Sequence, residues 1–175
     1  MRVSQEIEIT PAKVIINGEP VAVKEKGEKM LVELYRQYAN DYPKFFKMDT
    51  LCRLGFIASE ILLREEQVEA VILANRSASI KNDTDYLATI TGENYYPSPA
   101  LFVYTLPNIV TGEIAIRHHI QGETSFYILQ EKDEQMMEKI IEASFADIGT
   151  KRVLCGWIDA EDDDHFEAEL KTIEI

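Results

Sequence analysis

The run EAVILAN at residues 69–75 most constrains the fold, because it would place apolar side chains on both faces of an extended chain. A run of this length and composition predicts a β-strand that is buried on both sides. Such a strand needs covering layers above and below its sheet, and apolar residues recur at helical spacing before and after it. Strands that alternate with helices predict an α/β layered domain with a mostly parallel central sheet.

The segments before this strand predict a strand, a hairpin and two helices. Residues 2–9 alternate polar and apolar side chains, and Asn17-Gly18 lies between apolar flanks, which indicates a tight hairpin turn. Apolar residues then recur at helical spacing over 27–40 and over 48–65. Asp49 is placed to cap the second of these helices.

Two segments directly follow the buried strand. The first is a polar loop with a short helix, and the second combines a turn, an apolar run and a longer helix. The loop and short helix occupy residues 77–90. The stretch 95–123 opens with a Pro-Ser-Pro turn and crosses the apolar run LFVYTL. It then predicts a helix that begins at Pro107 and ends at Gly122. Residues 125–129 predict a short buried strand.

The last third of the chain predicts one helix and two strands. The helix is capped near Asp133 and ends at Gly149. A buried strand follows at 152–159, and residues 166–175 alternate strictly, which is typical of a half-exposed terminal strand.

Size and charge limit the classes of function. At 175 residues and 46% hydrophobic, the chain suits one domain over 1–175 with a substantial core. It contains no signal-peptide pattern and no apolar run of the roughly 20 residues that a membrane span needs. Two distant cysteines predict no disulfide and favour a reducing cytoplasm. The net charge of −13 argues against binding to nucleic acid or to anionic membranes.

Two segments resemble the N-terminal half of β-ketoacyl synthases, the condensing enzymes of fatty-acid and polyketide synthesis. They are PSPALFVYTLPNIVTGEIAIRHHIQGE, at 97–123, and YPKFFKMDTLCRLGFIASEILL, at 42–63, and the likeness extends over about 42–160. Glu123 stands where that family carries a proline. The resemblance implies a thiolase-like half domain, with a five-stranded, mostly parallel sheet covered by helices and preceded here by the hairpin. A whole ketosynthase has two such halves, and this chain has room for one.

The resemblance also implies where catalysis would occur, and the residues for it are missing. The family's cysteine nucleophile falls near Glu131, yet no Cys, Ser or Thr lies between Phe126 and Ala143. The family's two catalytic histidines belong to the C-terminal half. In the family the cysteine lies on a strand-to-helix turn, which we call the elbow. Here Gln130 and Glu131 occupy a degenerate elbow. Chain length factors and decarboxylating ketosynthase-like domains similarly carry Gln in place of the Cys.

Three functions therefore stay open. The first is a non-catalytic ketosynthase-like subunit or pseudo-enzyme of a fatty-acid, polyketide or aryl-polyene pathway. The second is a malonyl or acyl-thioester decarboxylase or acyl transferase that uses Gln130 or Glu131. The third is a ligand-binding module that kept only the fold. No cofactor is expected for any of them.

The resemblance implies partners as well. In the family, the strand equivalent to 125–129 pairs with its twin across a dimer axis. This predicts a homodimer, or a heterodimer with a full-length ketosynthase, and covers an otherwise open sheet edge. An acyl carrier protein is a possible further partner. Because such carriers are acidic, it would have to dock on a local basic group such as Lys44, Lys47 or Arg64.

Other reactive residue types have structural interpretations. Cys52 and Cys155 lie in apolar segments, where free cysteines usually pack. His118 and His119 are adjacent on a helix, so they diverge by about 100° and do not chelate one ion; a helix C-terminus would favour their positive charge. The acidic run 160–165 lacks the spacing of a calcium loop and predicts a solvated turn. No metal site is expected.

Polar residues that follow the strand at 69–75 are the candidates for ligand binding. In α/β domains, ligands bind at the carboxyl ends of the strands. Arg76 could meet a phosphate or carboxylate, and Ser77, Ser79 and Asn108 could line the same cleft. Turn formation is an equally good explanation for such residues.

Overall fold

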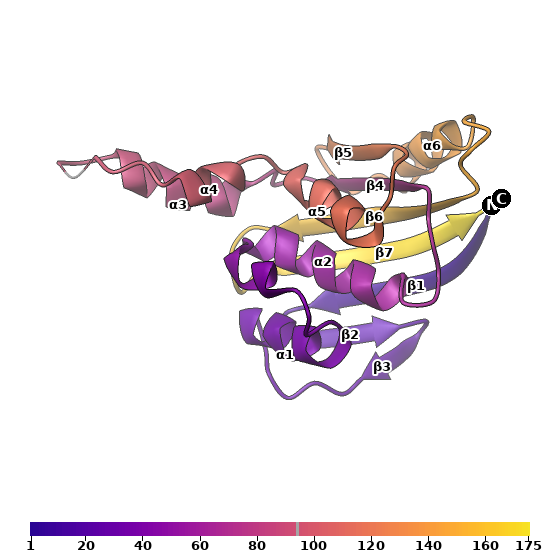
Figure 1. Cartoon of the computed structure of the whole chain (residues 1–175), viewed down its shortest axis with the longest axis horizontal. Coiled ribbons are helices and arrows are strands. Elements are labelled where there is room, and N and C mark those ends of the chain that lie inside the picture. The colour runs from indigo at the N-terminus through magenta and orange to yellow at the C-terminus, as the bar shows by residue number, and fades with distance from the viewer. Residues whose placement is uncertain (94) are drawn as a thin grey trace.

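The computed structural model describes residues 1–93 and 95–175, and its centre is one seven-stranded sheet (Figure 1). The strand order is β3-β2-β1-β7-β6-β4-β5. The strands are β1 (Arg2–Thr10), β2 (Lys13–Ile16), β3 (Glu19–Val21), β4 (Ala70–Asn75), β5 (Thr124–Ile128), β6 (Arg152–Ala160) and β7 (Phe166–Glu174).

The sheet is mixed and mostly antiparallel, so the expectation of a five-stranded, mostly parallel sheet is wrong. Only β4 runs parallel to its neighbours, β5 and β6, whereas β7 is antiparallel to both β1 and β6. The segment expected to be a terminal strand at 166–175 is β7, which lies in the middle of the sheet. The alternation of polar and apolar residues shows which face of the sheet each side chain points to. It does not show which strand lies next to this one, or in which direction that strand runs.

The N-terminal hairpin is confirmed. β2 and β3 pair antiparallel around Asn17 and Gly18, whose φ angles are 51° and 80°. Two successive positive φ values match the right-handed twist of the paired strands, which is why Asn-Gly is favoured at this turn.

Helices cover the two faces unequally. The helices are α1 (Glu28–Tyr38), η1 (Pro43–Lys47), α2 (Thr50–Leu62), α3 (Ile80–Ile90), α4 (Pro99–Val103), α5 (Ile109–His118) and α6 (Glu134–Ser144). A large apolar cluster joins α1, α2 and α5 to one face, and a smaller one joins α6 to the other face. Among the described residues, none of the helices combines the length and hydrophobicity that a bilayer-spanning segment needs.

The caps predicted for two helices are confirmed. The Asp49 carboxylate accepts a hydrogen bond from the Cys52 backbone N–H at 2.9 Å, at the start of α2. The Asp133 carboxylate accepts one from the Met136 N–H at 2.9 Å, at the start of α6. Each bond satisfies one of the free donors at a helix N-terminus.

The stretch 95–123 and the strand after it differ from their expected forms in three places. α4 begins in the Pro-Ser-Pro turn, where the Ser98 hydroxyl caps it. α5 begins at Ile109 and ends at His118, because His119 adopts a left-handed conformation with φ 57° and stops the helix before Gly122. β5 is a half-exposed edge strand instead of a buried one.

α3 and α4 form an arm that projects beyond the sheet (Figure 1). We define the arm by residues 77–93 and 95–108, which connect the end of β4 to the start of α5. α3 and α4 lie against each other along the arm.

α2 and α5 cross at Gly55. A Cβ atom on Gly55 would lie 2.3 Å from Val110 Cγ2 and 3.0 Å from Ile158 Cδ1, so only glycine allows the two helices to lie this close. Gly112, on α5 itself, makes no such close approach. A Cβ there would meet no atom of the described residues within 4 Å.

We predict that Gly55→Ala lowers the free energy of unfolding by about 1–3 kcal/mol, because α5 must move to relieve the clash with Val110. Gly112→Ala is the matched control. It should raise stability by about 0.5–1 kcal/mol, since alanine favours the helix and the site is open. Urea titration followed by circular dichroism measures both; an unchanged midpoint for Gly55→Ala would contradict the prediction.

Candidate functional site

The carboxyl ends of β4, β5 and β6 surround a hollow of about 530 Å³, which we call the strand-end hollow. Arg76 directly follows β4, Glu131 lies three residues after β5, and Asp159 lies near the end of β6. Neighbouring strands that run parallel deliver these residues to one edge of the sheet, which is the usual ligand-binding edge of an α/β fold.

The cations around this hollow are paired with acids. Arg76 forms an ion pair with Glu161, and Lys132 forms one with Glu169. His165 Nδ1 lies 2.8 Å from Asp162 Oδ2, and this hydrogen bond raises the pKa of His165 and lowers the pKa of Asp162. A hollow whose cations are already neutralised has little remaining affinity for an anionic ligand such as a phosphate.

The expected elbow lies between β5 and α6. Gln130 and Glu131 are both exposed, and neither side chain hydrogen-bonds to any other described residue. Asp133 caps α6, so the end of the helix that could stabilise an oxyanion already holds a carboxylate. The elbow therefore presents a solvated amide and a solvated carboxylate, without a nucleophile.

The structure separates the four predicted binding residues. Arg76 lines the strand-end hollow with Glu131. The Ser77 hydroxyl bonds to Asp159 Oδ2 at 3.2 Å, and the buried Ser79 hydroxyl donates to the Thr105 carbonyl at 2.7 Å.

The fourth predicted residue, Asn108, is exposed and precedes α5 without a side-chain cap bond. Of the predicted residues, Arg76 and Glu131 therefore line the same hollow, while Ser77 and Ser79 hold local structure.

Sequence reasoning missed several residues of the hollow. Trp157, Asp159 and His165 line it from β6 and from the turn before β7. The 160–165 segment had been predicted as a solvated turn, which it is: the Asp162 carboxylate accepts from the backbone N–H groups of Asp164 and His165. Only knowledge that β6 ends beside β4 could have placed this turn at the site.

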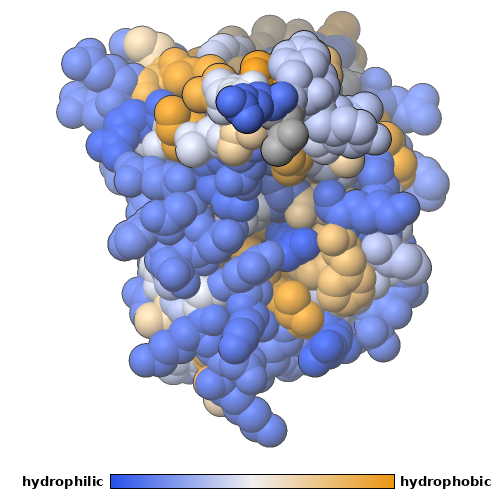
Figure 2. Space-filling model, turned by 90° about the vertical axis from the view of Figure 1, so that its left-hand side faces the viewer, coloured by the Kyte–Doolittle hydropathy of each residue, from blue (hydrophilic) through white to orange (hydrophobic). Residues whose placement is uncertain are grey.

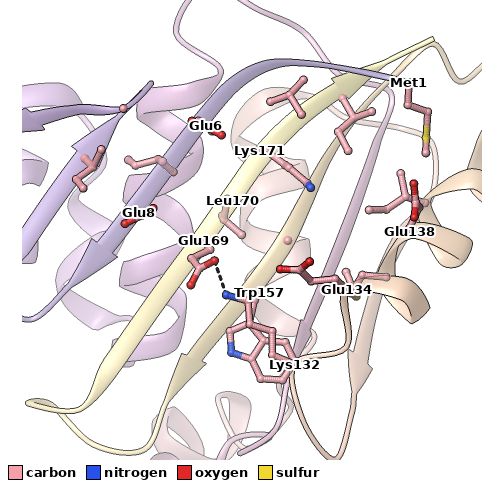
Figure 3. Close-up of a pocket in the computed structure, with 18 residues that line it drawn as sticks. Met1, Glu6, Glu8, Lys132, Glu134, Glu138, Trp157, Glu169, Leu170 and Lys171 are labelled. Carbon is pink, nitrogen blue, oxygen red and sulfur yellow. Dashed lines mark ion pairs between the residues drawn. The ribbon is translucent and has the colours of Figure 1, made fainter.

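A second hollow of about 510 Å³, the sheet-face hollow, lies between α6 and the outer faces of β1 and β7 (Figure 3). Charged side chains surround it: Lys171 points in from β7, and Glu134 and Glu138 border it from α6 (Figure 3). Trp157 and Lys132 line both hollows. The Trp157 indole N–H donates to Glu167 at 2.9 Å, so even the largest aromatic side chain here has a polar partner.

Within residues 1–93 and 95–175, no three His, Cys, Asp or Glu side chains gather closely enough to hold a metal ion.

The two cysteines pack away from both hollows. Cys52 lies on α2 and Cys155 on β6, and both are almost fully buried. Burial raises the pKa of Cys155 to about 12 and raises the pKa of Cys52 well above its ordinary value. A thiol that stays protonated and inaccessible is a poor nucleophile.

We therefore predict that neither cysteine reacts with iodoacetamide in the native protein at pH 8 within an hour. Both should react within minutes in guanidinium chloride, because unfolding exposes the thiols and restores their ordinary pKa. Intact-mass spectrometry counts the adducts. Rapid addition of one adduct to the native chain would mean that Cys52 or Cys155 is accessible and active.

His118 and His119 do end a helix, as expected, but His118 does not gain positive charge there. Its ring Nε2 lies 3.2 Å from the Ser59 hydroxyl and 3.3 Å from the Glu60 carboxylate. Burial lowers the pKa of His118, and this effect outweighs the attraction of Glu60. The helix C-terminus therefore holds a neutral imidazole.

This lowered pKa predicts a pH dependence of stability. The unfolded chain takes up a proton on His118 below its ordinary pKa of about 6.5, whereas the folded chain resists it. The contribution of His118 to the free energy of unfolding should therefore fall as pH drops from about 7.5 to 5.5, and His118→Gln should remove this contribution. His119→Asn, at an exposed left-handed position that asparagine tolerates, should retain it. Equal pH profiles for wild type and His118→Gln would contradict the assignment.

Comparison with known proteins establishes the fold. Neither protein-family models nor curated protein sequences match this chain. Two solved structures are similar over 99% of it.

The first is the ketosynthase ApeO in complex with its chain length factor ApeC, from Xenorhabdus doucetiae, at a TM-score of 0.67 and 13% identity; the chain covers 79% of the matched chain. The second is the ishigamide ketosynthase/chain length factor, at a TM-score of 0.70 and 16% identity, with 61% of the matched chain covered. The fold is that of ketosynthase and chain-length-factor proteins, as the resemblance in sequence implied.

Proposed function

We propose that this chain is a non-catalytic, ketosynthase-like subunit that pairs with a catalytic ketosynthase in polyketide or fatty-acid synthesis. The observation that carries the proposal is the elbow between β5 and α6 on a ketosynthase-like fold. At that turn the chain offers exposed Gln130 and Glu131, and no Cys, Ser or Thr occurs from residue 126 to 143. Acyl transfer to the protein requires an activated nucleophile, which this elbow does not supply.

The remaining thiols support the same conclusion. Cys52 and Cys155 are buried, their pKa values are raised, and neither lines a hollow. A decarboxylase would instead need to stabilise the carbanion formed from a malonyl thioester. A solvated carboxylate at Glu131 opposes such negative charge.

The edge strand β5 supports a pairing role. It pairs with β4 on one side, and the strand order places it at the end of the sheet. An exposed strand edge offers unpaired backbone donors and acceptors, which a second subunit can satisfy by continuing the sheet. A partner of the same fold has an equivalent strand to offer.

One of the similar structures gives a precedent for the partner. It is a ketosynthase in complex with its chain length factor, and we extend this arrangement to the present chain by analogy of fold. Contact with an acyl carrier protein through Lys44 is less favoured, since Lys44 is engaged with Glu113 at 2.5 Å, whereas Lys47 and Arg64 are exposed and stay candidates for it.

The test of the proposal is turnover. Purified protein incubated with malonyl and acyl thioesters of a carrier protein should show no acyl adduct by intact mass and no release of thiol. Affinity capture from the organism that makes the chain should recover an identified ketosynthase. The reconstituted pair should condense acyl and malonyl thioesters, and the ketosynthase alone should do so at least about tenfold more slowly.

Variants of the elbow make the result decisive. Gln130→Ala and Glu131→Ala should leave the activity of the pair within about twofold, as should Glu134→Ala, an exposed control on the first turn of α6. Turnover by the isolated chain that Glu131→Ala or Gln130→Ala abolishes, but Glu134→Ala does not, would establish an enzyme and overturn the proposal.

A further inference from the structure

A groove along α1 gathers cations on a chain that is strongly acidic as a whole. It has a volume of about 430 Å³ and lies between α1 and the loop that precedes this helix; we call it the α1 groove. Lys24 borders it from the loop, and Lys29 and Arg36 border it from the helix. All three residues are exposed. The chain carries a net charge of −13, so this cluster opposes the charge of the molecule around it.

The loop beside the groove is held in a fixed position. The Glu33 carboxylate of α1 accepts hydrogen bonds from the backbone N–H of Glu25, at 2.8 Å, and from that of Lys24, at 3.0 Å. These two bonds lower the pKa of Glu33. At the end of the loop, the Gly27 N–H donates to the Pro11 carbonyl at 2.8 Å. The cation on the loop is therefore placed opposite the helix before any partner arrives.

The cations of the groove are not neutralised by nearby acids. Glu28, on the first turn of α1, forms its ion pair with Arg53 of α2. Among the described residues, no ion pair includes Lys24, Lys29 or Arg36. This distinguishes the α1 groove from the strand-end hollow, where Arg76 and Lys132 are paired with carboxylates.

The spacing of these side chains fits a helix of another protein. Lys29 and Arg36 are two turns apart on α1, which separates their backbones by about 10 Å. Val32 lies between them on the same face and lines the groove. An apolar centre with a charged rim is the usual composition of a protein interface. A matching helix would carry two carboxylates at the same separation, with an apolar side chain between them.

A small anion is a poorer match for this groove. Small anions are held where several backbone N–H groups converge on one point. Here the two N–H groups of the loop already bond to the Glu33 carboxylate. Lys29 and Arg36 are also too far apart to hold one phosphate together. In Figure 2, hydrophilic residues prevail in the lower part of the view, at the height of α1 in Figure 1, and hydrophobic residues gather at the height of the arm.

A second copy of this chain also matches the groove less well than a different acidic protein. On the arm, Asp83 accepts a hydrogen bond from the Ser79 hydroxyl and Asp85 pairs with Lys81, so these carboxylates are already engaged. On α6, the exposed acids are accompanied by the exposed Lys139, which would meet the cations of the groove. Neither element presents two free carboxylates around an apolar side chain without such a conflict.

We propose that the α1 groove docks an acidic helix of a different protein. Under the function proposed above, this protein is an acyl carrier, because acyl carriers are acidic. The identity of the partner as a carrier rests on that function, whereas the docking of an acidic helix rests on the three unpaired cations and on their spacing. Contacts of this kind mainly raise the rate of association and make binding sensitive to salt.

Titration of a purified, isotope-labelled acyl carrier protein from the same organism with the full chain tests the proposal. NMR spectra of the carrier report weak binding and show which of its helices is contacted. We expect the spectra to change along one acidic helix. Kd should rise at least about tenfold from 0.1 M to 1 M NaCl, because the Debye length falls from about 10 Å to about 3 Å.

Charge-reversal variants locate the contact. Lys29→Glu combined with Arg36→Glu should weaken binding at least about tenfold in 0.1 M NaCl, because two attractions become repulsions. Lys139→Glu combined with Lys151→Glu is the matched control, since both residues are exposed, lie outside the groove and change the net charge equally. The control should change Kd less than about threefold. Circular dichroism should show equal folding of both variants.

Two further variants make the assignment specific. Lys29→Arg combined with Arg36→Lys keeps both charges and should bind the carrier within about twofold of the wild type. Lys47→Glu combined with Arg64→Glu reverses the two exposed cations that are the other candidates for carrier contact. It should behave like the control.

The remaining results separate the inference from the proposed function. A carrier that does not bind, or that loses affinity equally in the control or only with Lys47→Glu and Arg64→Glu, overturns docking at the groove and leaves the non-catalytic role standing. Binding that depends on the groove, together with turnover of thioesters by the isolated chain, supports the docking and overturns the proposed function. A dimer that Lys29→Glu with Arg36→Glu converts to a monomer in ultracentrifugation would assign the groove to a second copy and overturn the inference.

Discussion

The close crossing of α2 and α5 at Gly55 determines where α5 and the arm lie. α5 follows the arm, and the buried Tyr104 anchors the arm at its base. Val110 lies against Gly55, so a larger residue at position 55 would displace α5. Because the arm leads directly into α5, we expect a displacement of α5 to move the base of the arm as well.

The charged side chains of the candidate site and the exposed apolar side chains are found in different parts of the molecule. At the strand ends, where a ketosynthase-like fold performs catalysis, cations are neutralised by Glu161 and Glu169, and the elbow is solvated. On the arm, apolar side chains face water while polar groups bond internally. The proposed function rests on this separation: we propose that the chain acts by contact with another subunit instead of by its own chemistry.

Local elements were predictable from the sequence, but their neighbours were not. The Asn17-Gly18 turn and the caps at Asp49 and Asp133 depend on a few adjacent residues, and all were confirmed. The strand order depends on contacts between distant segments, which explains the wrong prediction of a parallel sheet. The site shows the same division: Arg76 and Glu131 were predicted, whereas Asp159 required knowing that β6 lies beside β4.

The central position of β7 determines when the protein can fold. Within the sheet, β7 alone connects the hairpin side, β1 to β3, with the parallel side, β4 to β6. Glu174 bridges the two sides directly, because its carboxylate binds Arg2 on β1 and Arg152 on β6. Contacts between residues far apart in the sequence slow folding, and open strand edges invite aggregation meanwhile. The two sides of the sheet therefore cannot join until β7 is available to pair with both.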